Sequence, residues 1–305
     1  MLQHAPKKTI RFYKRDSFVF NTCNGLFMII LFVIMIYPFW NTIAVSFNNA
    51  QDTLKGGITF WPRKFSLYSY ESVFRSNLMI TAAVNSVART LIVTVLGVFI
   101  SALIAYVISR KELIGRRFIT GYFLLTMYIS AGLIPTYFLI KDLGLLKNFW
   151  VYILPNLINV FNVIVIKSFI LSLPDSLAEA AVVDGAGHFR CFIQIIVPCC
   201  KPVLATVALW YAVGAWNSWF DTFLYASAAD NLTTLQYEMM KLLSSAMNTG
   251  RSGNVVAGQT QMVNTVTPAS MRAAVTIVAA TPILIVYPFL QKYFVKGVTL
   301  GAVKG

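Results

Sequence analysis

Apolar runs recur along the whole chain and are separated by shorter polar segments. Each run is at least about 20 residues long, the length that an α-helix needs to cross ~30 Å of hydrocarbon. The pattern predicts six membrane-spanning helices, at residues 19–45, 78–109, 118–140, 149–172, 203–225 and 273–295. The segments between them are too short for a large soluble domain. We therefore expect an all-α membrane protein with six transmembrane helices in a single domain.

The composition indicates that the lipid bilayer is the main environment. Of the 305 residues, 57% are apolar and 12% are charged, and the mean hydropathy is +0.69, which is far outside the range of soluble proteins. The formal charge of +14 would suit nucleic-acid binding. However, the Lys and Arg residues lie between apolar runs and form no basic patch interleaved with exposed aromatic residues. We expect no nucleic-acid partner.

The Lys and Arg residues also predict the orientation in the membrane. Six crossings place both termini on one side, and the segments of that side hold 15 Lys and Arg residues, against 9 on the other side. The excess of positive charge predicts that both termini are cytoplasmic. The expected organisation is a basic cytoplasmic tail at 1–18, a single six-helix membrane domain at 19–296 and a cytoplasmic tail at 297–305.

Two segments on the predicted outer side are long enough for structure of their own. Residues 46–77 carry Trp61 and an aromatic cluster around Tyr68 and Tyr70, which suits a short helix at the membrane interface. Residues 226–272 include a stretch rich in Met and Leu near Met239. This stretch could dock on a partner or rest on the membrane surface.

The cytoplasmic segment 174–202 has a distinct local pattern. Pro174 ends one helix, and Asp175 or Ser176 can cap the next. Gly185 then supplies a turn that a side chain would disfavour. The pattern predicts a short helix, a glycine turn at positive φ and a second short helix. Such a knob, which carries the Glu179 carboxylate, could fit a groove on a soluble partner.

This segment resembles the EAA loop of binding-protein-dependent ABC importers. The pattern is Glu-Ala-Ala, three residues, Gly, nine residues, Ile, one residue and Leu-Pro, and Val197 stands here where leucine is usual. The resemblance implies a coupling helix that docks in a cleft of an ATPase subunit, with Glu179 paired to a basic residue. The residues that it implicates in ATPase coupling are Glu179, Ala180, Ala181, Asp184, Gly185, Phe189, Ile195 and Pro198.

The resemblance extends over nearly the whole chain from Val19. Residues 85–90, 105–111, 216–221 and 287–297 look like the maltose-type, carbohydrate-uptake branch, and residues 301–305 look most like a subgroup that imports oligosaccharides released from polysaccharides. It implies the type I ABC importer permease fold and a location in the bacterial plasma (inner) membrane. The implied partners are a second homologous permease, two ATPase subunits, an extracytoplasmic binding protein, either a lipoprotein or periplasmic, and a carbohydrate substrate.

Polar and aromatic residues inside the predicted spans are candidates for the translocation pathway. Thr81, Asn85 and Arg89 recur at four-residue spacing, and a cation within a membrane should face protein or water. The fifth span combines aromatic rings with amide and carboxylate groups, which suits sugar contact, although such faces can equally be packing. The candidate pathway residues are Asn85, Arg89, Asn156, Asn159, Trp210, Trp216, Asn217, Phe220 and Asp221, and Asn162 extends the polar seam of the fourth span.

Other function classes lack the residues that they need. The sequence has no Gly-x-x-x-x-Gly-Lys-[Ser/Thr] phosphate loop, so we expect no ATP site, no cofactor and no enzymatic activity. An ion-coupled secondary transporter is the alternative, but it would need buried carboxylates, and Asp221 alone is a plausible one. A membrane glycosyltransferase would need a catalytic carboxylate or metal cluster. His188 and the three nearby cysteines match no zinc spacing.

Overall fold

The computed structural model describes residues 7–74, 77–183, 185–251 and 267–302. Over these residues the chain is helical, and its β-structure is one isolated bridge between Asn48 and Phe65. The all-α prediction is therefore confirmed. The chain forms two compact units, Met1–Ser72 with Asn254–Ile277, and Val73–Gly253 with Val278–Gly305. Each unit is described by itself.

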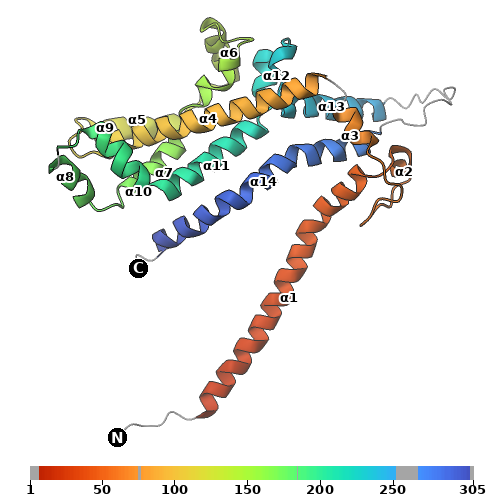
Figure 1. The fold of residues 1–305 in the computed structure, drawn as a ribbon, viewed down its shortest axis with the longest axis horizontal. Helices are drawn as coiled ribbons and strands as arrows, with labels where there is room; N and C mark the ends of the chain where they lie inside the picture. Colours follow the sequence, from red (N-terminus) through yellow and green to blue (C-terminus); the bar gives the residue numbers. More distant parts are fainter. Residues whose placement is uncertain (1–6, 75–76, 184, 252–266, 303–305) are drawn as a thin grey trace. The chain divides into compact units, whose positions relative to one another are not determined.

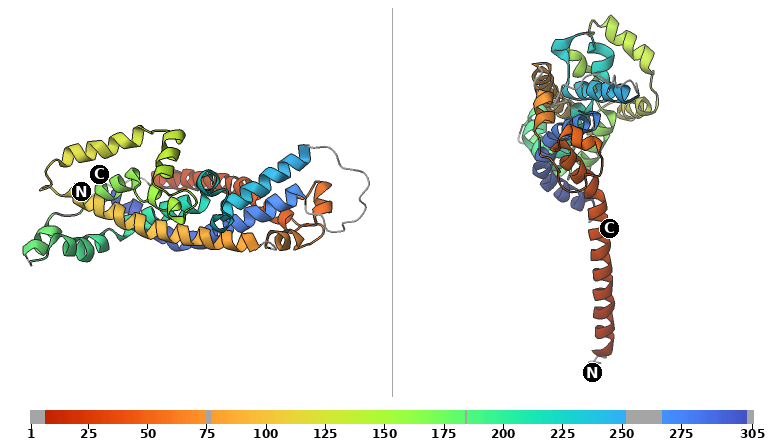
Figure 2. Two further views of the ribbon diagram at one scale, coloured as in Figure 1. Left: turned by 90° about the horizontal axis from the view of Figure 1, so that it is seen from above. Right: turned by 90° about the vertical axis from the view of Figure 1, so that its right-hand side faces the viewer.

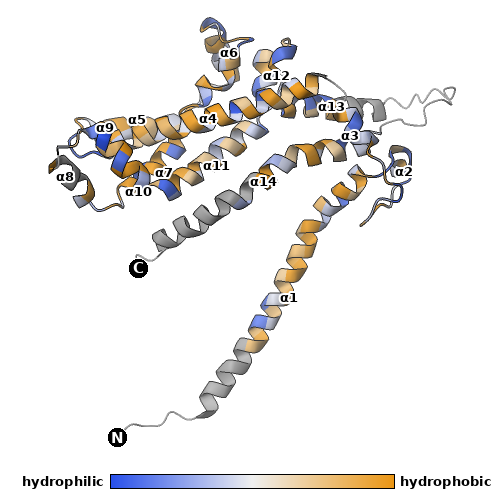
Figure 3. Ribbon diagram, viewed as in Figure 1, coloured by the Kyte–Doolittle hydropathy of each residue, from blue (hydrophilic) through white to orange (hydrophobic). Residues whose placement is uncertain are grey.

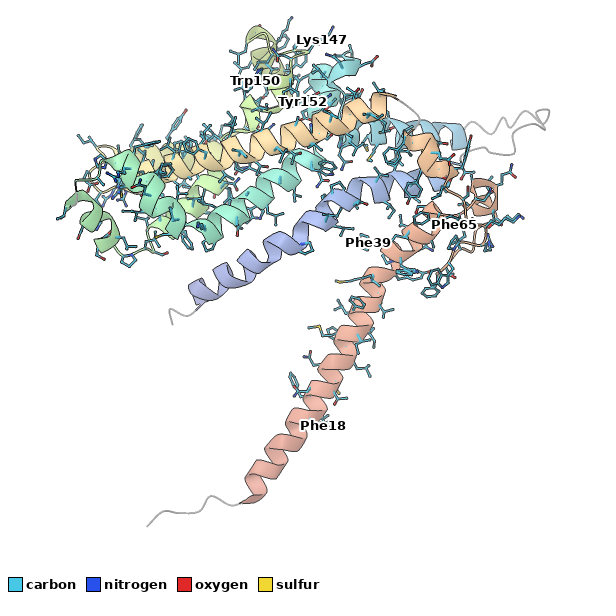
Figure 4. All side chains as sticks on the ribbon, viewed as in Figure 1. Phe18, Phe39, Phe65, Lys147, Trp150 and Tyr152 are labelled. Atoms are coloured by element: carbon cyan, nitrogen blue, oxygen red, sulfur yellow. The ribbon has the colours of Figure 1, made fainter. Side chains whose placement is uncertain are left out.

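The first unit contains the long helix α1, Lys7–Ser46 (Figure 1). Within it, Phe18–Ser46 is a 29-residue apolar helix, long enough to cross a membrane. Its large side chains are exposed on all sides, Phe18 and Phe39 among them (Figure 4). A helix that is apolar all round needs lipid or a partner protein around it. It matches the first predicted span, although it begins at Lys7, inside the predicted basic tail.

The segment after α1 folds back on the end of that helix. Trp40 Nε1 donates a hydrogen bond to the Phe60 carbonyl at 2.8 Å, and Asn41 Nδ2 donates to the Ile58 carbonyl at 2.7 Å. These side chains satisfy carbonyl groups of a stretch that has no regular structure of its own. Two short helices, α2 (Ala50–Leu54) and α3 (Tyr68–Phe74), follow. The predicted short helix in this segment is confirmed by α3.

A buried carboxylate holds this folded-back segment together. Asp52 Oδ2 accepts hydrogen bonds from Asn48 Nδ2 at 3.1 Å and from Arg63 Nε at 2.9 Å. The Asn48 hydrogen bond, together with the Arg63 guanidinium, lowers the pKa of Asp52 below its ordinary value. The ionised carboxylate thus links the two ends of the 48–63 segment.

The second unit is built around α4, Asn77–Ser109, which packs along α11, Lys201–Asn217, and α7, Val160–Ile170 (Figures 1 and 2). Apolar residues cover most of α4 (Figure 3). The three helices close a dry core of small and branched side chains: Val93, Ala102, Ala105, Val163, Ile166 and Val207 are all buried in it. Leu78–Ser109 is 32 residues long and is the second helix of the described chain that can cross a membrane unbroken.

The third predicted span is not one straight helix. α5, Arg116–Tyr128, and α6, Leu133–Asp142, meet at an angle of 114° (Figure 2). Gly132 lies at the bend with φ +84°, a conformation that L side chains rarely adopt. Pro135, in the first turn of α6, tolerates that position because its missing N–H is not needed there. The apolar run continues through the break, which is why its hydropathy alone predicts a single helix.

The fourth and fifth predicted spans are also interrupted. The fourth consists of two 3₁₀ turns, η1 (Phe149–Tyr152) and η2 (Leu154–Asn156), followed by α7 at an angle of 45°. The fifth ends as α11 at Asn217, and the chain resumes as α12, Phe220–Ala226. The prediction of one continuous helix over residues 203–225 was therefore wrong, because the backbone is extended at Ser218.

The sixth predicted span lies in α14, Pro268–Ala302, which contains the apolar stretch Ala269–Ile285. By length and composition, the described residues hold two helices that can cross a membrane, or up to five if each bent pair is one crossing. All six apolar runs thus correspond to helical segments, of which the third and fourth are bent and the fifth is interrupted at Ser218.

The Met- and Leu-rich segment that we predict to lie outside forms α13, Leu235–Arg251, after the 3₁₀ turn η4, Asp230–Leu232. The start of α13 packs on its own chain: the Leu235 N–H donates to Ser86 Oγ at 2.8 Å, and Met239 is buried. The start of α13 thus covers polar groups of α4. The two alternatives for the stretch, docking on a partner or resting on the membrane surface, stay predictions.

Candidate translocation and coupling sites

A cavity of about 520 Å³ opens in the second unit between α4, α7 and α11. Its wall combines charged, amide and aromatic groups. The lining residues are Arg89, Val93, Tyr152, Asn156, Asn159, Phe161, Asn162, Trp210, Tyr211, Gly214, Ala215, Ser218 and Asp221. They converge from separate stretches of the chain, because the breaks in the fourth and fifth spans bring non-helical backbone to the cavity. Irregular backbone at membrane depth is tolerated where it lines such a cavity.

Arg89 of α4 holds the break between α11 and α12. Its guanidinium forms an ion pair with Asp221, with Nη1 3.2 Å from Oδ2, and it donates from Nη2 to the Ser218 carbonyl. The guanidinium also lies over the ring of Tyr152, 5.3 Å from its centroid. A planar fork can satisfy a carboxylate and a carbonyl together. Arg89 thereby caps the end of α11 and fixes the start of α12.

Tyr211 of α11 holds the break in the fourth span. Its hydroxyl lies 2.8 Å from Ser101 Oγ, donates to the Leu157 carbonyl at 3.1 Å and accepts from the Asn159 N–H at 3.1 Å. The Asn159 side chain then caps α7 by accepting from the Asn162 N–H at 3.2 Å. The hydroxyl of Tyr211 therefore satisfies the backbone carbonyl and N–H groups that are left unpaired between η2 and α7.

Aromatic rings and amide groups form most of the open wall of the cavity. Phe161 and Trp210 lie with their ring centroids 5.3 Å apart, and both rings are exposed. Asn156 and Asn159 are exposed beside them. Aromatic faces with nearby amides suit the apolar faces and hydroxyl groups of a sugar. No cation of the cavity wall is exposed in the described residues, because Arg89 is buried.

The candidate pathway residues divide into two groups. Arg89, Asn156, Asn159, Trp210 and Asp221 lie together in the cavity wall. The other four lie outside the cavity wall and make packing contacts. Asn85 of α4 donates to the Asn231 and Thr233 carbonyls. Around the break of the fifth span, Trp216 donates to the Ala279 carbonyl and Asn217 accepts from Gln236. Phe220 packs against Trp219 and Phe223. The pathway role of all nine residues stays a prediction.

Sequence reasoning missed Tyr152, Phe161 and Tyr211, which also line the cavity. Isolated aromatic residues in apolar runs carry no local signal. The position of Phe161 directly beside the polar seam of Asn159 and Asn162 could have indicated it. Tyr152 and Tyr211 bond to residues more than 50 positions away in the chain. The spacing of apolar and polar residues cannot predict such distant contacts.

The second candidate site is the knob beyond the C-terminal end of α4 (Figure 1). It comprises α8 (Ser176–Val183), α9 (His188–Cys191), a π-helical turn η3 (Phe192–Ile196) and α10 (Val197–Cys199). Gly185 adopts φ +76° between α8 and α9. The prediction of two short helices and a positive-φ glycine turn is confirmed. Phe189 and Pro198 are exposed and Ile195 is half-buried.

An ion pair connects this knob to the loop after α4. Lys111 Nζ lies 2.7 Å from Asp175 Oδ2, and both side chains are exposed. The Lys111 ammonium lowers the pKa of Asp175, and the Asp175 carboxylate raises the pKa of Lys111. Beside the pair, a cavity of about 380 Å³ is lined by Arg110, Lys111 and Glu179, among others. Asp184 lies outside the described residues, as do the side chains of Ala180 and Ala181.

Titratable groups elsewhere in the described chain do not gather into a metal centre. No group of three or more His, Cys, Asp or Glu side chains in the described residues could hold a metal ion. Cys191 and Cys200 are buried, and Cys23 and Cys199 are exposed. Among the described residues, the polar chemistry therefore concentrates in the cavity beside Arg89 and in the knob.

Comparison with known proteins shows the family to which this chain belongs. No family model matches the sequence. The polygalacturonan/rhamnogalacturonan transport system permease protein YtcP of Bacillus subtilis (strain 168) is 37% identical over 281 residues, which cover 92% of this chain and 96% of YtcP. The maltodextrin transport system permease protein MdxG of the same strain is 30% identical over 295 residues, 93% of this chain and 96% of MdxG. The chain belongs to the permeases of bacterial ABC sugar importers.

A solved structure agrees with this family. The permease chain matched in a bacterial ABC transporter that imports the acidic polysaccharide alginate superposes with a TM-score of 0.78 at 26% identity, over 92% of this chain and 98% of that chain. The predicted permease fold, sugar-transport function and bacterial membrane location are confirmed. The permease is a transport subunit, and ATP hydrolysis in such importers belongs to separate ATPase subunits.

Proposed function

We propose that this permease passes a polysaccharide-derived oligosaccharide through the cavity beside Arg89 and Asp221, and that residues 174–198 couple this passage to an ATPase subunit. A second homologous permease forms the rest of the pathway, and an extracytoplasmic binding protein delivers the sugar. Both chain termini and the 174–202 knob face the cytoplasm, and residues 226–272 face outward.

The observation that carries the proposal is the composition of the cavity wall. Five residues that the sequence marks as pathway candidates meet there from three separate spans. The wall pairs the Phe161 and Trp210 rings with amide groups, which can hold a sugar through its apolar face and its hydroxyl groups. Its volume of about 520 Å³ suits one to a few sugar units.

The relatives support the class of cargo. YtcP and MdxG are described by their transport of polygalacturonan or rhamnogalacturonan and of maltodextrin. AraQ of Bacillus subtilis (strain 168), 24% identical over 310 residues, is described by transport of arabinooligosaccharides. These cargoes share chains of several sugar units and differ in charge. An oligosaccharide is therefore the cargo class that we assign to this permease.

Coupling through the knob is supported by its shape and position. The knob projects an exposed Glu179 and an exposed Phe189 beyond the end of α4, and the ion pair between Lys111 and Asp175 ties it to the loop at 110–115. A short helix on a glycine turn can enter a groove of a soluble partner. Movement of that partner would reach α4 through this loop.

The direct test of the pathway is oligosaccharide uptake by the reconstituted transporter. Trp210→Ala removes a ring from the cavity wall, and Trp150→Ala is a matched control, because Trp150 is exposed in η1 (Figure 4) and is not among the lining residues. We expect uptake to fall about two- to tenfold in Trp210→Ala, since an aromatic contact typically contributes about 0.5 to 1.5 kcal/mol, and to stay unchanged in Trp150→Ala. Equal uptake by the two variants would contradict the proposed pathway.

A further inference from the structure

The cavity wall contains one cation and one anion, but only the anion is accessible. The Arg89 side chain is 1% exposed, whereas the Asp221 side chain is 16% exposed. Arg89 lies behind Asp221, so that a molecule in the cavity meets the carboxylate first. The sequence predicts that this arginine faces protein or water, and the structure places it against protein.

The donors of Arg89 are engaged or buried. Nη1 donates to both oxygens of Asp221, at 3.3 and 3.2 Å, and Nη2 donates to the Ser218 carbonyl. Nε is buried and has no hydrogen-bond partner in the structure. The ring of Tyr152 covers the guanidinium. No donor of Arg89 is therefore open to an anion in the cavity.

The carboxylate of Asp221 retains acceptor capacity. Its two oxygens offer about four acceptor positions. Oδ1 accepts from Arg89 Nη1 and from the Thr222 N–H at 2.9 Å, while Oδ2 accepts from Arg89 Nη1. Oδ2 keeps a free position, and the side chain lines the cavity. A carboxylate paired with Arg89 accepts hydrogen bonds and donates none.

We propose that the cavity is a subsite for an uncharged sugar unit, in which Asp221 accepts hydrogen bonds from sugar hydroxyl groups and disfavours a sugar carboxylate. The remaining accessible groups, the Asn156 and Asn159 amides and the Phe161 and Trp210 rings, carry no charge. The buried charge of Arg89, behind Asp221, offsets the repulsion only in part. A carboxylate placed near Asp221 meets a like charge in a medium of low dielectric constant.

This inference rests on the proposed function and makes it more specific, because it assigns the class of sugar at one position. Arg89 is a positioning residue here: it orients Asp221 without touching the sugar. Asp221 is the residue that determines specificity. Other units of the same oligosaccharide can carry carboxylates where they lie outside this cavity.

Two trisaccharides that differ only at C6 provide the test. Galactotriose carries hydroxymethyl groups where trigalacturonate of the same linkage carries carboxylates. Binding of each to the complete transporter in nanodiscs, without the binding protein, is measured by saturation-transfer NMR titration. We expect the wild type to bind galactotriose at least about tenfold more tightly. In Asp221→Asn the preference should reverse toward trigalacturonate, because the Arg89 charge is then uncompensated.

A second variant keeps the inference testable if Asp221→Asn fails to fold. Arg89→Met combined with Asp221→Leu removes both charges, and we expect it to bind the two sugars within about threefold of each other, since the like-charge term is gone. A wild-type preference for trigalacturonate, or a galactotriose preference that persists in Asp221→Asn, would overturn the inference alone. Binding of neither sugar, or binding that Trp210→Ala leaves unchanged, would contradict the proposed function and the inference with it.

Discussion

Gly97 of α4 lies against the ring of Tyr211 of α11, so closely that a Cβ atom added at Gly97 would lie 2.8 Å from the ring. The same tyrosine carries the hydroxyl that satisfies the Leu157 carbonyl and the Asn159 N–H at the break of the fourth span. Because position 97 has no side chain, α11 can approach α4. This approach places Tyr211 and its partner Asn159 in the cavity wall.

We expect Gly97→Ala to destabilise the permease by about 1 to 3 kcal/mol, the usual cost of overpacking a core. Alanine is a better helix former than glycine, so Gly97→Ala would raise the stability if Tyr211 did not lie against this position. Thermal unfolding of the purified transporter measures the change. Gly121→Ala in α5, where a Cβ meets nothing within 4 Å, is the matched control. Equal midpoints for the two variants would show that Tyr211 can move aside freely.

The coarse architecture follows from the sequence because hydropathy depends only on local composition. Six apolar runs predict helices, and the turn at Gly185 follows from the geometry that glycine alone adopts readily. The knob is equally local, since α8, the turn and α9 all lie within residues 174–191. These features need no knowledge of distant contacts.

The breaks in the spans do not follow from the sequence, because distant groups stabilise them. The backbone opens at Ser218 where Arg89, 129 positions away, supplies donors to the Ser218 carbonyl and Asp221. It opens near Leu157 where Tyr211 supplies a hydroxyl. Helical periodicity assumes an unbroken helix, so it assigns Trp216 and Phe220 to one face, although they lie on different helices.

The ion pair between Arg89 and Asp221 should be sensitive to loss of either member. Arg89→Leu leaves a carboxylate without its counter-ion at membrane depth, and this typically costs about 3 to 5 kcal/mol. Arg89→Lys keeps the charge but cannot span both Asp221 and the Ser218 carbonyl, so we expect an intermediate loss. Unfolding midpoints in a double-mutant cycle with Asp221→Asn measure the coupling. Additive effects of the two single changes would refute this interaction.

The Asp52 network predicts a pH dependence in the 48–66 segment. Since the Asn48 hydrogen bond and Arg63 lower the pKa of Asp52 below 3.8, the stability that the carboxylate contributes is present above that pH and is lost as the pH falls through the lowered pKa. Hydrogen exchange of the Asn49 and Ser66 amides, corrected for intrinsic rates, should therefore be constant from pH 7 to about pH 5. Asp52→Asn should raise exchange throughout this range, and an unchanged rate in that variant would contradict the role of the carboxylate.

The proposed orientation can be tested in intact cells. Single cysteines at Gly187 and Asp230, both exposed positions, are introduced into a variant that lacks the four native cysteines. An impermeant maleimide should label position 230 from outside, and position 187 only after the membrane is permeabilised. Labelling of position 187 alone in intact cells would invert the topology.

Coupling to an ATPase through residues 174–198 depends on the turn at Gly185. Gly185 has φ +76° and nothing within 4 Å of an added Cβ, so that Gly185→Val acts through backbone strain of about 1 to 3 kcal/mol and not through a clash. Gly187, with φ −66° and equally open surroundings, is the matched control. Glu179→Ala tests the charged contact separately, because an unpaired partner group at a buried interface typically costs a few kcal/mol.

The most direct measurement is therefore ATP hydrolysis and oligosaccharide uptake in the same liposomes, for the complete transporter carrying each variant with its binding protein. We predict that sugar-stimulated hydrolysis is coupled to uptake in the wild type and in Gly187→Val. In Glu179→Ala and Gly185→Val, we predict that the stimulation or the uptake falls at least about tenfold while the permease still inserts in the membrane. Wild-type stimulation together with wild-type uptake in both of these variants would contradict the coupling role of this segment.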